Sequence, residues 1–319
     1  MTDEQSPPTS VPLAPELSVI ITCYYEEESI EEFYTRLSKT MEGLKRPYEI
    51  IFVNDGSTDR TLAKMEGLFE QDEHVSTVID LFKNRGQTVA ETAGLVHARG
   101  EKIVLMDSDL QLDPEELPLL LEEFDKGYDL VSAFRKNRKD PLFRRACSRI
   151  VNMFMRRASQ CNLRDFGCVF KVIDARLIRA FDYGAYRTLH PVSLIASAQR
   201  TSEVPVTHHP RRYGRSSWNF WKLLVFAISS LVGVSHSPLQ FLSVACFLLA
   251  LLVLGYILVG WVAPLALLSP VTPGLILSMI VLNLLVTVGI LTAMGELVIR
   301  HYVMRKRRPA YIIRTIRKR

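Results

Sequence analysis

Short runs of apolar, β-branched residues alternate with segments whose apolar positions recur at helical spacing. Between the first two runs, Ile30, Phe33, Leu37 and Met41 follow the 3.6-residue period of a helix. Strands that alternate with helices predict βαβ units and an α/β fold built on a mostly parallel sheet. The expected strands are residues 17–22, 48–53, 75–82, 103–106 and 129–134, with 203–206 as an edge strand because it contains Pro205.

Acidic side chains follow two of these strands directly. Asp107 and Asp109 come after the strand at 103–106, and Asp55 comes after the strand at 48–53. Open α/β sheets bind ligands at the carboxyl edge of their strands. Two carboxylates at that edge suit Mg²⁺ or Mn²⁺ carrying a phosphate-bearing substrate. An Asp-x-Asp pair is a short motif, however, and two solvated loop acids would give the same pattern.

A long stretch of the chain carries no charge. Residues 223–295 contain no Asp, Glu, Lys or Arg, and prolines divide them into apolar segments at about 239–263 and 275–299. Each segment exceeds the ~20 residues that cross a bilayer, whereas a buried helical hairpin is the alternative. Basic residues flank both outer ends and the connecting loop has none. The positive-inside rule therefore predicts a multi-pass inner (plasma) membrane protein with a cytosolic N-terminal domain and C-terminus.

Basic and aromatic residues precede this apolar region. Residues 135–157 are rich in Lys and Arg with interleaved apolar positions, as in a helix that lies on an anionic membrane surface. An ordinary solvated basic face and a nucleic-acid site are the alternatives. The apolar region that follows favours membrane lipids, and we expect no nucleic-acid partner. Trp218, Phe220, Trp221 and Lys222 have the composition of a membrane interface.

These patterns divide the chain into five parts. We expect a disordered N-terminus at 1–16, a cytosolic domain at 17–210, an interfacial juxtamembrane segment at 211–237, two membrane helices within 238–300 and a basic cytosolic tail at 301–319. The five cysteines are odd in number and lack metal-binding spacing, which indicates reduced thiols in a protein facing the cytosol.

Five motifs occur in order along the chain: Ser18–Glu28, Val53–Asp59, Asn84–Gln87, Met106–Gln111 and Arg211-x-x-Gly214-x-Ser216. With these motifs and the membrane tail that follows them, the chain resembles the family 2 glycosyltransferases of the GT-A (Rossmann-like) fold. Within that family it resembles the polyisoprenyl-phosphate glycosyltransferases with two C-terminal membrane helices. The resemblance covers roughly Leu17 to Ile313.

The resemblance implies a donor site and a catalytic set. Asp107 and Asp109 would hold Mg²⁺ or Mn²⁺ with the diphosphate, Asp109 most directly. Gln111 would face the sugar, and Asp165 would act as a base or orient the acceptor, so that Asp109, Gln111 and Asp165 form the catalytic set. The implied nucleotide-sugar contacts are Thr22, Tyr24, Glu26, Asp55, Arg85, Gln87, Asp107 and Asp109.

The acceptor would be a phosphate monoester, which is already anionic and needs cations to bring it near the donor diphosphate. The candidates for that role are Arg135, Arg138, Arg211, Arg215 and Ser216. Ser217 stands where the family pattern usually has Lys, and Arg215 is the candidate to replace that cation.

Together these features predict a metal-dependent glycosyltransferase. It would transfer a sugar, with inversion, from a nucleotide diphosphate sugar (UDP-linked in the first instance) to a polyprenyl phosphate of the undecaprenyl type. The resemblance allows a homotetramer. The alternatives are a processive polysaccharide synthase, whose usual Gln-x-x-Arg-Trp motif is absent here, and a non-catalytic membrane scaffold, against which the intact acids speak.

Overall fold

The structure is a computed structural model that describes most of the chain. It describes residues 14–136, 161–185, 191–210, 273–305 and 309–319, with shorter runs at 152–153, 155–157, 159, 188–189 and 212–213. The chain forms two compact units, one of residues 1–220 with 309–319 and one of residues 221–308. Each unit is described by itself below.

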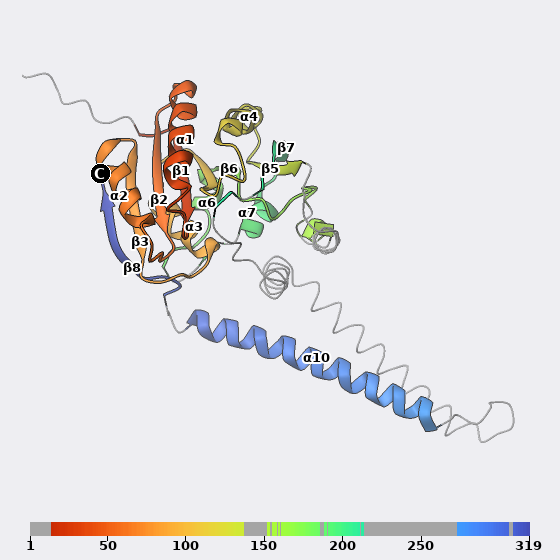
Figure 1. The fold of residues 1–319 in the computed structure, drawn as a ribbon. Helices are drawn as coiled ribbons and strands as arrows, with labels where there is room; N and C mark the ends of the chain where they lie inside the picture. The colour runs from red at the N-terminus through yellow and green to blue at the C-terminus, as the bar shows by residue number, and fades with distance from the viewer. Residues whose placement is uncertain are drawn as a thin grey trace, which may run out of the picture. The chain divides into compact units, whose positions relative to one another are not determined.

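One mixed sheet forms the centre of the first unit (Figure 1). Its strands are β1 (Leu17–Cys23), β2 (Tyr48–Asn54), β3 (Val75–Leu81), β4 (Lys102–Asp107), β5 (Leu130–Lys136), β6 (Lys171–Asp174), β7 (Thr201–Thr207) and β8 (Ile313–Lys318). They lie in the order β7-β5-β6-β4-β1-β2-β3-β8. β1 to β4 pair in parallel, as do β5 and β7, whereas β6 is antiparallel to both β4 and β5. The expected mostly parallel α/β sheet is therefore confirmed, and β7 with its proline lies at an edge.

Alternate residues of each strand bury against different helices. Val19 and Ile21 of β1 belong to a core shared with α1 (Ile30–Leu44), α2 (Thr61–Gln71) and α4 (Leu117–Phe124). Ile20 faces α3 (Gln87–Leu95) instead, where Gly94 packs so closely that an added Cβ would lie 2.5 Å from Ile20. Shorter helices complete the unit: η1 (Pro114–Glu116), α6 (Ala175–Arg179) and α7 (Pro191–Ser197).

Two strands of the sheet were not expected from the sequence. The four residues of β6 are too few to show a strand period. β8 lies in what we had described as a basic tail, and it pairs antiparallel with β3 (Figure 1). Its sequence is Ile-Arg-Thr-Ile-Arg-Lys, and the basic side chains are exposed, as is common on an edge strand.

The second unit contains α10 (Pro273–Arg305). Among the residues that the structure describes, no helix combines the length and the hydropathy needed to cross a membrane. The expected first membrane helix, at 239–263, lies outside the described residues, as do the interfacial segment from residue 214 on and residues 1–13.

Candidate active site

The Asp-x-Asp loop leaves the carboxyl end of β4. Asp107 is its first acid, and its Oδ1 accepts hydrogen bonds from Thr22 Oγ1 at 3.3 Å and from Gln87 Nε2. Asp109 is 9% exposed, and its Oδ1 accepts the backbone N–H of Gln111 at 3.1 Å. Between them and Gln111, buried Leu110 has a φ of +57°, a strained conformation of the kind that clusters at functional sites.

The negative charges of Asp107 and Asp109 repel each other, so a cation at this site would stabilise both carboxylates. Burial first, and then the charge of Asp109, raise the pKa of Asp107 to about 7, against the hydrogen bonds from Thr22 and Gln87. Mg²⁺ is commonly held by one or two carboxylates together with substrate phosphates and water. Within the described part of the chain, no group of three or more His, Cys, Asp or Glu side chains could hold a metal ion alone. The pair Asp107 and Asp109 therefore fits a metal that arrives with a diphosphate.

Asp55 holds the neighbouring loop at the same edge of the sheet. Its two carboxylate oxygens accept the backbone N–H groups of Arg85 at 2.7 Å and Gly86 at 2.8 Å. Burial raises the pKa of Asp55 to about 6, although these hydrogen bonds oppose the rise. Gly56 has a φ of +72°, and an added Cβ would lie 2.5 Å from the backbone of Lys83, so only glycine lets the two loops approach this closely. The side chain of Arg85 itself is exposed.

The loop after β1 lies at the same edge of the sheet, because β1 runs parallel to its neighbours β4 and β2. The backbone N–H of Glu26 donates to Thr61 Oγ1 at 3.0 Å, and its carboxylate accepts from Ser29 Oγ at 2.6 Å. Tyr24 is partly buried and its ring lies 4.5 Å from that of Tyr25. The residues expected to bind the nucleotide sugar thus come from the last residues of β1 and β4, from the loops after β1, β2, β3 and β4, and from the start of α3.

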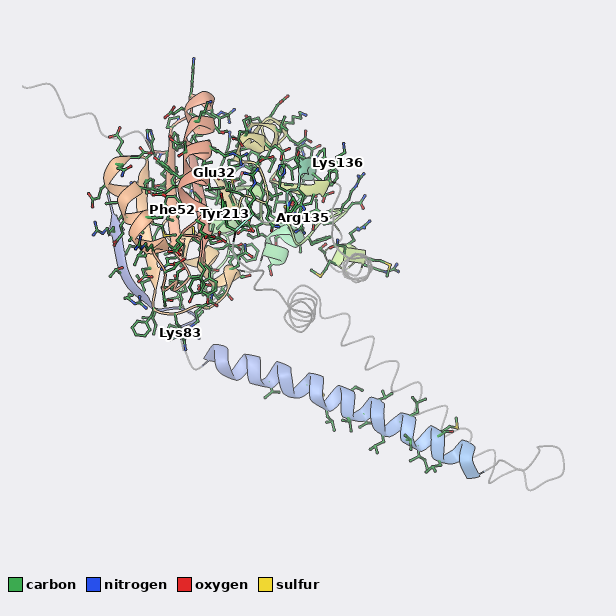
Figure 2. The ribbon with its side chains drawn as sticks, in the orientation of Figure 1. Glu32, Phe52, Lys83, Arg135, Lys136 and Tyr213 are labelled. Carbon is green, nitrogen blue, oxygen red and sulfur yellow. The ribbon has the colours of Figure 1, made fainter. Side chains whose placement is uncertain are left out.

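Arg135 and Asp165 form a two-pronged ion pair. Arg135 Nε and Nη2 donate to the two carboxylate oxygens of Asp165 at 2.7 and 2.9 Å, and Asp165 is buried (Figure 2 labels Arg135). The carboxylate of Glu203 accepts the backbone N–H groups of Arg164 and Asp165 at 2.6 and 3.1 Å. Arg135 is the expected phosphate ligand and Asp165 the expected base or acceptor-orienting carboxylate, and in the structure the two side chains pair with each other.

The strand register relates this pair to the Asp-x-Asp loop. Leu105 of β4 and Ser132 of β5 both pair with Lys171 of β6, which lies between them. Asp107 lies two residues beyond Leu105 along β4, and Arg135 lies three residues beyond Ser132 along β5. The two strands run in the same direction, because β6 is antiparallel to both. Two strand spacings separate the two residues, so their backbones lie roughly 10 Å apart at the same edge of the sheet.

Several candidates for the acceptor phosphate cannot be placed. Arg138, Arg211, Arg215 and Ser216 lie outside the described residues, and their roles stay predictions.

Two buried charged residues were missed in the sequence. Glu91 of α3 is 3% exposed and Lys171 of β6 is 2% exposed. Burial and the charge of Asp107 raise the pKa of Glu91 to about 8, and Lys171 opposes this rise. The only sequence indication was the position of Glu91 one helical turn after Gln87, on the face that meets Asp107.

A mixed α/β sheet with an Asp-x-Asp loop at its carboxyl edge is the architecture of a GT-A-like sugar transferase. The model of the family described as "Glycosyl transferase family 2" matches residues 18–183. The chain belongs to this family.

Its curated relatives include two proteins that match almost the whole chain. It is 33% identical to the undecaprenyl-phosphate 4-deoxy-4-formamido-L-arabinose transferase of Pectobacterium carotovorum subsp. carotovorum, over 93% of this chain and 92% of the relative. It is 34% identical to the protein of the same name from Proteus mirabilis, over 94% of this chain and 93% of the relative.

Solved structures share the fold at low sequence identity. Glucosyl-3-phosphoglycerate synthase from Mycobacterium tuberculosis, in complex with Mn²⁺, UDP and glucosyl-3-phosphoglycerate, matches with a TM-score of 0.50 and 18% identity, over 70% of this chain and 82% of that chain. The same enzyme with Mg²⁺ and UDP matches with a TM-score of 0.50 and 19% identity, over 70% and 81% of the two chains.

Proposed function

We propose that the protein transfers a sugar from a UDP-linked donor to undecaprenyl phosphate and forms an undecaprenyl-monophosphate sugar. The observation that carries this proposal is the placement of Asp55, Asp107 and Asp109 at one sheet edge, in a chain of which 93–94% aligns with relatives named as undecaprenyl-phosphate sugar transferases. The relatives' names make 4-deoxy-4-formamido-L-arabinose the first sugar to test.

The proposed donor side recognises a nucleoside diphosphate. Asp55 faces the base or ribose as a hydrogen-bond acceptor, with the loop of Tyr24 and Glu26 beside it. Asp107 and Asp109 hold Mg²⁺ or Mn²⁺, which when bound neutralises the charge that develops on the departing diphosphate. Thr22 and Gln87 fix the orientation of Asp107, because both donate to its Oδ1.

The proposed reaction is a single displacement at the anomeric carbon. An oxygen of the acceptor phosphate attacks C1 of the sugar from the face opposite the leaving group. The bond between C1 and the β-phosphate oxygen breaks, and UDP leaves with both electrons, so the configuration inverts. The phosphate monoester is already ionised, and therefore Asp165 need not remove a proton. The bidentate pair with Asp165 instead presents the Arg135 guanidinium toward the anionic acceptor.

The acceptor is a lipid, so we propose that the second unit anchors the enzyme in the membrane. The absence of charge in residues 223–295 supports this proposal. The exposed apolar side chains of α10, among them Leu277, Leu284 and Leu291, also support it. In the proposed arrangement two helices, at 239–263 and 275–299, cross the inner membrane and leave the domain and the C-terminus in the cytosol.

The test is a donor screen with the purified full chain in detergent, undecaprenyl phosphate and Mg²⁺ or Mn²⁺. We expect one UDP-sugar to give a lipid-linked monosaccharide with release of an equal amount of UDP. Asp109→Asn should abolish turnover while the melting temperature stays close to that of the wild type.

Three outcomes would contradict the proposal. A growing polymer would indicate a processive synthase. The lack of any product with every donor would indicate a scaffold. Full activity of Asp109→Asn would exclude the proposed metal site.

A further inference from the structure

The segment after β7 is tied to the loop that carries Asp109 and Gln111. The backbone N–H of His209 donates to the carbonyl oxygen of Gln111 at 2.9 Å. The His209 ring is bonded to the same loop, since its Nε2 lies 2.7 Å from Asp113 Oδ2. His209 therefore contacts this loop on both sides of Leu112, once through the backbone and once through the side chain.

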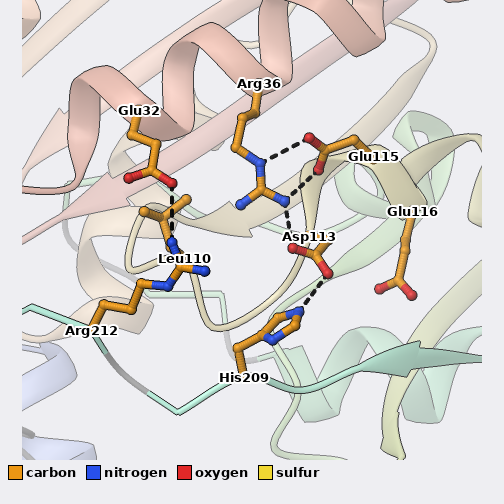
Figure 3. A pocket seen from close by; sticks show the side chains of 8 residues that line it. All are labelled: Glu32, Arg36, Leu110, Asp113, Glu115, Glu116, His209 and Arg212. Carbon is orange, nitrogen blue, oxygen red and sulfur yellow. Dashed lines mark hydrogen bonds and ion pairs between the residues drawn. The ribbon is translucent and has the colours of Figure 1, made fainter.

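Asp113 is in turn held by helix α1. Arg36 Nη2 donates to Asp113 Oδ1 at 2.5 Å, and the same guanidinium binds Glu115 at 2.7 and 2.8 Å (Figure 3). Burial works against ionisation, but the hydrogen bonds from Arg36 and His209 keep the pKa of Asp113 below its usual range. Through these contacts Arg36, Asp113 and His209 join helix α1, the loop that carries Asp109 and Gln111, and the segment after β7.

Two further sets of contacts join β7 and the segment after it to η1 and to α1. Thr207 donates to the carboxylate of Glu116 from its backbone N–H at 3.0 Å and from its hydroxyl at 2.9 Å. Arg212 lies 3.5 Å from Glu32 of α1 (Figure 3). Glu32, Glu116 and Arg212 line an open pocket of about 490 Å³ together with Leu110. The loop is therefore held by residues of α1 and of the segment after β7, while Leu110 within it keeps a strained backbone.

We propose that His209, oriented by Asp113, is a positioning residue that sets the place of Gln111 opposite the donor sugar. The inference rests on the proposed function, because Gln111 acquires a task only if a sugar donor binds at this edge. His209 touches no substrate in this proposal and acts through the loop alone. A displacement of about 1 Å in such a loop can lower turnover by ~100-fold without loss of binding.

The experiment compares His209→Ala with a matched control, His74→Ala. His74 is also half exposed and pairs with an aspartate, Asp72, at 2.8 Å, but it precedes β3 at the opposite edge of the sheet. We expect His209→Ala to lower kcat by 10- to 100-fold while the Kd for UDP stays within about twofold. His74→Ala should keep the wild-type kcat.

Two further variants separate positioning from general damage to the fold. His209→Gln can place an amide nitrogen near the position of Nε2, so we expect it to recover most of kcat, whereas His209→Met should not. Asp113→Ala should lower kcat as His209→Ala does, and the double variant should be little worse than either single variant.

The outcomes distinguish this inference from the proposed function. If the wild type and His74→Ala transfer no sugar from any donor, the proposed function fails. If both are active and His209→Ala matches them, only the positioning role fails. A loss of UDP binding equal to the loss of kcat, or equal losses in His209→Gln and His209→Met, would also overturn it.

Discussion

Arg314 of β8 allows a test of how the C-terminal strand supports the domain. Its Nη1 lies 3.2 Å from Oδ2 of Asp80, which is 1% exposed, and this oxygen accepts no hydrogen bond from any residue that the structure describes. The other oxygen of Asp80 accepts from Asn54 Nδ2 at 2.7 Å, directly beside the proposed nucleotide site. Replacing Arg314 with Met would leave a buried carboxylate without its cation.

The cost follows from burial on each side of the pair. Removing one partner of a fully buried ion pair costs about 3–5 kcal/mol. The Arg314 side chain is 46% exposed, so water can replace part of it, and we expect a loss of about 2 kcal/mol. For a domain of this size that loss lowers the melting temperature by roughly 4–8 °C.

Arg317 is the matched control on the same strand. It is equally exposed, but its partners Glu66 and Glu70 are themselves partly or largely exposed, so Arg317→Met should cost about 0–1 kcal/mol. Thermal unfolding of the full chain in detergent, followed by intrinsic fluorescence, measures both variants. Because the penalty arises from the buried charge of Asp80, Arg314→Met should lower the free energy of unfolding by less in an Asp80→Asn background. Equal melting temperatures for the Arg314 and Arg317 variants, or an unchanged effect in that background, would refute this reasoning.

Two other predictions concern packing and pH. Gly94→Ala places a Cβ against Ile20 and should destabilise the fold by about 1–3 kcal/mol, whereas Gly67→Ala, with no atom within 4 Å of its Cβ, should stabilise α2 by about 0.5–1 kcal/mol in the same melting assay. Burial raises the pKa of Asp55 from 3.8 to about 6, so its contribution to stability is complete below pH 4 and is lost as pH rises through about 6. Denaturant unfolding should therefore show the Asp55→Asn variant gaining roughly 3 kcal/mol on the wild type between pH 4 and pH 7, and a difference independent of pH would contradict this.

The parallel core of the fold could be predicted because its strands are long and buried on both faces. The five runs between 17 and 134 are rich in apolar and β-branched residues, and β1 to β5 follow them within a few residues. β6 and β8 could not be predicted in this way. β6 has four residues, and β8 owes its place to pairing with β3, more than 200 residues earlier in the chain, a long-range contact that local periodicity does not report.

The placement of the acids that we propose for the donor could be predicted because each acid ends or follows a recognisable strand. Asp55, Asp107 and the loop of Glu26 all follow apolar runs, and parallel pairing brings their ends together. The residues that hold Asp165 and Asp113 in place could not be predicted, because they are far from these acids in the sequence. Glu203 is distant in sequence from the backbone of Asp165 that it holds, and His209 is distant from Asp113, so only the fold brings each pair together.

The antiparallel strand β6 divides the candidate site into two halves with different supports. On one side, β1, β2 and β4 hold the donor acids in a fixed parallel register. On the other side, Arg135 depends on β5 and on Asp165, whose backbone is bound by Glu203 of the edge strand β7. In the proposed site, the packing of β6, where Lys171 is buried between Leu105 and Ser132, therefore sets the distance between the acids proposed for the donor and Arg135. A change at Lys171 should thus disturb transfer between the two halves more than it disturbs binding in either one.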